Sequence, residues 1–163
     1  MKNLSLKAKK GFSLIELLVV IAIIGILSAV GITTYSGYTA NAKKQATLAQ
    51  YSQVVSLLNA ESAKCAAGTG NWVFKNGTAT IACTSTPTAA NVAAYFNTDL
   101  GMKNPHKTDQ NGVVAAAAPS TNSAISVSVS GGAWTIKADV DGSHTSGSYS
   151  ANTGDKTITT TAY

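Results

Sequence analysis

Arginine is absent from this chain of 163 residues, and histidine and cysteine occur only twice each. Bidentate contacts to nucleic-acid bases favour arginine, so its absence argues against a site that reads base sequence. Cys65 and Cys83 have no nearby histidine or third cysteine to complete a zinc site. His106 and His144 stand in no catalytic motif, and we expect both to be solvated loop residues. We therefore predict no catalytic residue, no cofactor site and no metal site.

The positive charge of the chain is concentrated at one end. The net charge is +5, but Lys2, Lys7, Lys9 and Lys10 all precede Gly11. Beyond Gly11, lysines and acidic residues nearly balance. The basic residues thus describe a leader rather than a binding surface, and DNA as a partner has no support in the charge distribution.

A long apolar run follows the basic leader. Residues 12–32 are nearly all apolar, and no charge lies between Glu16 and Lys43. About 20 such residues span a bilayer as a helix, and the leader lysines hold their end in the cytoplasm. The competing interpretation is a secretory signal cut near residues 28–29, but Leu27 stands where a small residue is needed. The sequence favours a retained span with the C-terminal part outside the cytoplasm.

Glu16 is the exceptional residue of the apolar run. A carboxylate within a membrane helix costs several kcal/mol unless it is paired, which makes it a candidate for function. It could instead lie at the interface or be protonated. We favour a partner, namely a positive group from another copy of the chain.

The segment KKGFSLIELLVVIAIIGIL, residues 9–27, resembles the class III leader and N-terminal helix of type IV pilins and of the pseudopilins of type II secretion. In that family a membrane peptidase cuts after the glycine and methylates the new N-terminal residue. The resemblance implies cleavage between Gly11 and Phe12 and N-methylation of Phe12. It also implies that Glu16 pairs with the N-terminal amine of a neighbouring subunit. The family's other partners are an assembly platform and a motor ATPase.

Periodicity predicts one long helix from Phe12 to about Lys64, with an apolar stripe at Leu48, Tyr51, Val55 and Leu58. Downstream, residues 71–83 predict a hairpin around Asn-Gly, residues 88–100 a short helix, residues 124–140 a second hairpin and residues 156–161 a last strand. Residues 112–122 have no clear period. The fold class is therefore α+β: a long N-terminal helix, transmembrane in its first half, packed on a C-terminal antiparallel sheet, as in type IV pilins.

Two local features complete the prediction. In an exported chain Cys65 and Cys83 are expected to form a disulfide that ties the first hairpin to the end of the helix, the alternative being two separate buried thiols. The stretch Asp139-Val140-Asp141-Gly142, with Asp155 downstream, resembles the start of a calcium loop of the kind some pseudopilins have. Its competing interpretation is an ordinary turn after a strand.

The predicted organisation has three parts: a cleaved leader (1–11), a transmembrane and assembly half of the helix (12–34), and a periplasmic or extracellular pilin domain (35–163). The predicted function is a structural subunit of a type IV pilus, serving adhesion, motility or DNA uptake, and not an enzyme. Before assembly it would be a single-pass inner-membrane protein, and afterwards part of a homo-oligomeric surface filament. The alternatives are a pseudopilin of type II secretion and, with least support, a membrane-anchored periplasmic enzyme or binding protein.

Overall fold

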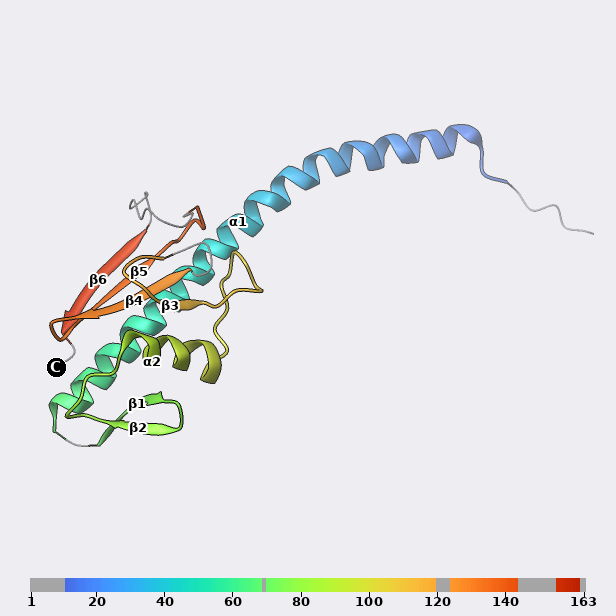
Figure 1. Cartoon of the computed structure of the whole chain (residues 1–163). Helices are drawn as coiled ribbons and strands as arrows, with labels where there is room; N and C mark the ends of the chain where they lie inside the picture. Colours follow the sequence, from blue (N-terminus) through green and yellow to red (C-terminus); the bar gives the residue numbers. More distant parts are fainter. Residues whose placement is uncertain (1–10, 69, 120–123, 144–154, 162–163) are drawn as a thin grey trace, which may run out of the picture. The chain divides into compact units, whose positions relative to one another are not determined.

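The computed structural model describes residues 11–68, 70–119, 124–143 and 155–161 (Figure 1). The chain divides into two compact units, Met1–Thr39 and Ala40–Tyr163. The helical elements are α1 (Leu14–Ala66), α2 (Ala89–Ala94) and a π-helical turn, η1 (Tyr95–Asp99). The strands are β1 (Asn71–Asn76), β2 (Ala79–Ala82), β3 (Val113–Ala115), β4 (Ile125–Ser130), β5 (Ala133–Ala138) and β6 (Lys156–Thr161).

The described part of the first unit is helical from Leu14 and presents its apolar side chains outward. Every large apolar residue from 12 to 32 is exposed, by between 47% and 86%. The most apolar 18-residue stretch of α1 has a mean hydropathy of 2.8, and α1 is long and apolar enough to cross a membrane. A helix segment that is apolar all round and that none of the described residues covers requires lipid or other helices around it.

In the second unit α1 buries a stripe of small and medium side chains. Thr47, Val54, Leu58, Ser62 and Cys65 are buried, at helical spacings of seven, four, four and three residues. Leu48, Tyr51 and Val55 are only partly buried beside this stripe. The predicted apolar face, with Val54 beside it, therefore does pack on the core. The prediction missed the small hydroxyl residues Thr47 and Ser62, which are buried with it.

A four-stranded sheet supplies the largest part of the core, in the order β3-β4-β5-β6. Strands β4, β5 and β6 pair antiparallel, and the predicted hairpin turns at Gly131 and Gly132 with φ of 57° and 76°. Trp134 and Ile136 of β5 are fully buried. They join Val54 and Leu58 of α1 in one apolar cluster. The predicted α+β class, a long helix followed by a sheet, is confirmed.

The sheet is not wholly antiparallel, and this corrects the prediction. β3 lies within residues 112–122, where no element was predicted, and pairs in parallel with β4. A three-residue strand is too short to show an alternating pattern, and only its pairing with β4 defines it.

The first hairpin forms as predicted, with β1 and β2 joined across Gly77, whose φ is 63°. It forms a separate two-stranded sheet. Thr88 begins α2 with a capping box, in which its hydroxyl and the side chain of Asn91 each accept a backbone N–H. The predicted helix over 88–100 ends as the π-helical turn η1, and Gly101 follows at φ 64°.

Candidate functional site: the N-terminal segment

The Gly11–Phe12 peptide bond lies outside regular structure. Residues 11–13 precede the helix and are exposed. Apart from Gly11 and its chain neighbours, no heavy atom of the described residues lies within 4 Å of where a side chain on Gly11 would begin. A peptidase has to bind an unfolded stretch of backbone on both sides of the bond that it cuts. On the side of the bond that the structure describes, residues 11–13 are exposed and outside regular structure.

Glu16 is held at the start of its own helix. The backbone N–H of Ser13 donates to Glu16 Oε2 at 2.9 Å. Ser-x-x-Glu at a helix start is the capping-box pattern, and a carboxylate there is also favoured by the helix dipole. The sequence reasoning missed this role, although the spacing of Ser13 and Glu16 would have indicated it. The other oxygen of Glu16 has no hydrogen-bond partner within the described residues, so it remains available to a further donor.

The surroundings of Glu16 are apolar. Phe12, Ile15, Val19 and Val20 line a shallow, open surface together with Glu16. In lipid this surface offers no second polar partner from its own lining.

The predicted disulfide is confirmed. Cys65, in the last turn of α1, is bonded to Cys83, just after β2, and both are buried. Glu61 adds a second link between the helix and the hairpin, because its Oε2 accepts the backbone N–H of Val73 at 2.7 Å. Within the helix, the same oxygen accepts the ammonium of Lys64 at 2.6 Å. These contacts fix the first hairpin on the end of the helix.

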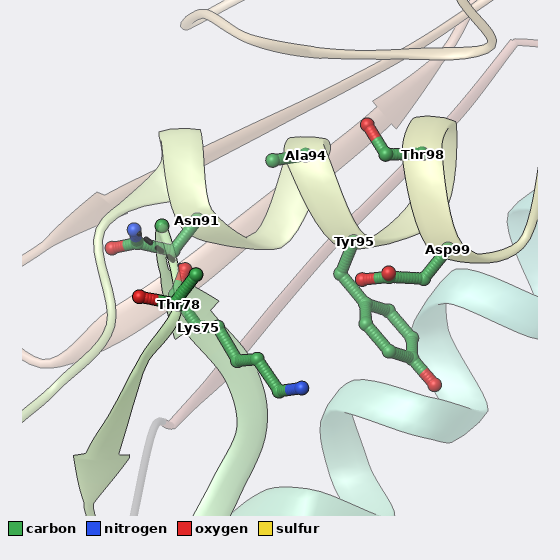
Figure 2. A pocket seen from close by; sticks show the side chains of 8 residues that line it. Lys75, Thr78, Asn91, Ala94, Tyr95, Thr98 and Asp99 are labelled. Carbon is green, nitrogen blue, oxygen red and sulfur yellow. Dashed lines mark hydrogen bonds between the residues drawn. The ribbon is translucent and has the colours of Figure 1, made fainter.

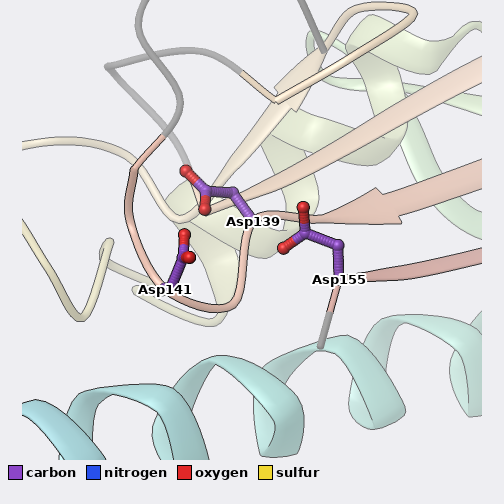
Figure 3. Close-up of side chains that lie close together, drawn as sticks. All are labelled: Asp139, Asp141 and Asp155. Carbon is purple, nitrogen blue, oxygen red and sulfur yellow. The ribbon is translucent and has the colours of Figure 1, made fainter. Parts of the chain in front are cut away.

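Asp139, Asp141 and Asp155 form an aspartate cluster, with carboxylate oxygens that lie within 4.8 Å of one another (Figure 3). Each carboxylate also accepts a backbone N–H. Asp139 accepts that of Gly142 at 2.8 Å, and Asp141 accepts that of Ser143 at 3.0 Å. Asp155 accepts that of Val140 at 3.0 Å. These bonds account for the cluster as the framework of a turn. Calcium takes six to eight oxygen ligands, more than three monodentate carboxylates supply.

The hydroxyl of Ser143 is the main cause of a lowered pKa at Asp141, since it donates to the charged form. Burial opposes this effect and raises the pKa, while the backbone N–H of Ser143, the side chain of Asp139 and the charge of Lys44 lower it further. The net direction is downward, so the turn is held best when Asp141 is ionised.

His106 corrects another prediction, because it is half-buried and not solvated. Its Nε2 lies 3.1 Å from the carbonyl of Val140 and 3.3 Å from the hydroxyl of Thr47. The carbonyl of Val140 can only accept, and the single hydrogen of the Thr47 hydroxyl already goes to the carbonyl of Lys43 at 3.1 Å. The Nε2 atom of His106 therefore carries the hydrogen and donates to both groups. The ring thus joins the helix to the aspartate turn. His144, the other histidine, lies outside the described residues.

A cavity of about 400 Å³ opens between the first hairpin and the helix after it (Figure 2). Its polar groups come from Lys75, Thr78, Asn91, Tyr95, Thr98 and Asp99. Asn91 already donates to the Lys75 carbonyl at 3.0 Å. None of its lining residues is a histidine or cysteine.

Comparison with known proteins finds matches to the N-terminal segment of the chain. Residues 6–32 match the model of the prokaryotic N-terminal methylation motif. The chain carries this motif. A fimbrial protein of Pseudomonas aeruginosa is 63% identical over 35 residues, which are 22% of this chain and 23% of that protein. A type IV major pilin protein, PilE1, of Neisseria gonorrhoeae is 60% identical over 35 residues, which are 22% of this chain and 21% of that one.

A longer match extends beyond the methylation motif. A fimbrial protein of Neisseria meningitidis serogroup A is 38% identical over 120 residues, covering 70% of this chain and 58% of that protein. The chain thus spans less than a quarter of the first relative and little more than half of the meningococcal one. No solved structure matches this chain significantly. The resemblance to the type IV pilin family is confirmed: the motif model matches residues 6–32, and the matching relatives are named fimbrial protein or type IV major pilin.

Proposed function

We propose that this chain is a structural subunit of a type IV pilus. The observation that carries the proposal is the exposed apolar first half of α1 combined with the methylation motif at its start. Such a helix is stable in lipid, and it can leave lipid only if other apolar helices replace it. Copies of the same helix, packed side by side, provide that replacement without a dedicated partner.

The processing proposal assigns residues 1–11 to a leader, 12–34 to the transmembrane and assembly segment and 35–163 to the exported domain. A prepilin peptidase would cut between Gly11 and Phe12 and methylate Phe12. The new amine would then lie close to the start of the helix, where the carboxylate of Glu16 is already held by Ser13. During assembly, Glu16 of one copy would pair with the amine of another.

The role is structural and not catalytic. The chemistry of assembly would come from a peptidase, a membrane platform and a motor ATPase, because this chain supplies a motif for being processed and a helix for packing. Localisation follows from the same segment: an inner-membrane anchor first and a surface filament later. A pseudopilin would share these features but form no long surface fibre.

The test uses the native cell and two matched variants. Mass spectrometry of sheared filaments should find a mature chain that begins with N-methylated Phe12. Glu16→Gln keeps an oxygen that can accept the Ser13 N–H but removes the charge, so it should be processed normally and fail to enter filaments. Ser13→Ala keeps the backbone N–H and the charge, so it should still assemble.

Three results would count against this function. A mature product that begins downstream of Ala29 would indicate an ordinary signal peptide. Normal filament entry by Glu16→Gln would remove the charge-pairing step. Intact long fibres on cells that lack the chain would assign it to a minor or pseudopilin role, whereas loss of all fibres is the expected result.

A further inference from the structure

The apolar run by itself does not define where the membrane ends. Residues 17–42 carry no charge, and as a helix they extend about 39 Å. The hydrocarbon core of a bilayer is only about 30 Å thick. The excess of about 9 Å, nearly two helical turns before Lys43, must therefore lie at the outer interface or beyond it, and other side chains have to set the depth of the helix.

The hydroxyl residues of the run do not set that depth. Ser28 donates to the carbonyl of Ile24 at 2.7 Å, and Thr33 and Thr34 both donate to the carbonyl of Val30, at 3.0 and 3.1 Å. Their polar groups are satisfied inside the helix and can enter hydrocarbon at little cost. Such residues leave the helix free to slide along the membrane normal.

Tyr35 and Tyr38 differ from these residues in two ways. They are exposed by 71% and 73%, and neither hydroxyl has a hydrogen-bond partner within the described residues. By contrast, Tyr51 and Tyr95 are partly buried against the core of the second unit. An unpartnered phenol is costly in hydrocarbon, while its ring is costly to leave in water.

The position of the two tyrosines resolves this conflict. Tyr35 lies 21 residues after Leu14, which is about 32 Å along a helix, close to the thickness of the hydrocarbon core. Tyr38 lies three residues further on and on the same side of the helix. Tyrosine is enriched at this depth in membrane proteins, because the ring rests among acyl chains and the hydroxyl reaches headgroups and water.

We propose that Tyr35 and Tyr38 form an interfacial anchor that binds the headgroup and glycerol region of phospholipids in the outer leaflet of the inner membrane. This inference rests on the proposed membrane anchoring of α1. The anchor fixes the depth of α1 before assembly. It holds residues 14–34 in hydrocarbon and keeps Glu16 near the cytoplasmic interface.

The experiment measures depth in the full chain, reconstituted into phosphatidylcholine vesicles whose lipids carry bromine either near the headgroup or near the bilayer centre. Tyr35→Trp and Tyr38→Trp each introduce a fluorescent reporter, and Ile23→Trp provides the matched reporter for the middle of the span. The native chain, with Trp72 and Trp134 buried, gives the background. Reporters at 35 and 38 should lose more fluorescence to headgroup-side bromine, and the reporter at 23 more to central bromine.

A second pair of variants tests whether the tyrosines cause the positioning. In the Ile23→Trp background, Tyr35→Ala with Tyr38→Ala should make quenching by the two lipids more nearly equal, because the helix then slides. The matched change of both tyrosines to phenylalanine keeps the rings and should shift the balance less.

The outcomes separate this inference from the proposed function. If reporters at 35 and 38 respond to aqueous acrylamide and to neither lipid while the reporter at 23 responds to central bromine, the anchor is wrong and the span stands. Unchanged quenching in the alanine pair also overturns the anchor, and points to a contact with a second copy as the role of the tyrosines. If no reporter responds to lipid, the membrane span fails, and the proposed function fails with it.

Discussion

Removal of the Cys65–Cys83 disulfide is the sharpest test of how the second unit is stabilised. The bond joins residues 18 apart in the sequence. In the chain-entropy description, releasing a loop of this size costs about 3 kcal/mol of unfolding free energy at 25 °C. Since small domains are typically stable by about 5–15 kcal/mol, this is a large share. Both cysteines are buried, so replacement by alanine also removes some packing.

The assay is urea unfolding of the full chain in detergent micelles, followed by the fluorescence of Trp72 and Trp134, whose rings are 6.5 Å apart in the core. The Cys65→Ala, Cys83→Ala chain should lose about 3 kcal/mol. Native protein in reductant should lose a similar amount, and the double variant should be insensitive to reductant. A loss below about 1 kcal/mol in both cases would refute the reasoning, and would show that the contacts of Glu61 hold the hairpin without the bond.

Further predictions concern the turns and caps of the second unit. Thr88→Ala removes a capping-box hydroxyl and should lower unfolding free energy by about 1 kcal/mol, an effect that Asn91→Ala should reproduce in part. Gly142→Ala should cost about 2–4 kcal/mol, because the new Cβ would lie 2.6 Å from the ring of His106 at a φ of +72°. Asp141 should contribute stability above its usual pKa of 3.8 and lose that contribution as pH falls through its lowered folded pKa; the pH dependence of the melting midpoint should flatten in Asp141→Asn. Calcium should leave the midpoint of the native chain unchanged, and a rise of several degrees would instead assign a cation to the aspartate cluster.

Much of the fold could be predicted because it is determined locally. The Asn76-Gly77 and Gly131-Gly132 pairs indicated both hairpins, since each turn requires positive φ. Thr88 indicated the start of α2 through its capping hydroxyl. The apolar run and the glycine before Phe12 indicated the class of the N-terminal segment. In each case the neighbours in sequence are also the neighbours in space.

The features that were missed depend on distant parts of the chain. β3 is defined by its parallel pairing with β4, and three residues contain no periodicity to detect. The buried stripe of α1 includes Thr47, which is buried because His106, 59 residues away, packs and bonds there. A histidine without a motif gave no signal of such a contact. Sequence patterns report which side chains avoid water, but not which small polar groups find partners inside.

Glu16 shows how one residue can satisfy two requirements in succession. A carboxylate that enters the membrane needs compensation before any other subunit is present, and the N–H of Ser13 together with the helix dipole supplies part of it. This bond uses one oxygen and holds the side chain at the helix end where the amine of the processed chain would lie. The neighbouring amine would then bind a carboxylate that is already oriented, so little side-chain entropy is lost on pairing. The backbone N–H of Ser13 and the carboxylate of Glu16 therefore form one local contact, and under the proposed function this contact orients the carboxylate for the amine of a neighbouring chain.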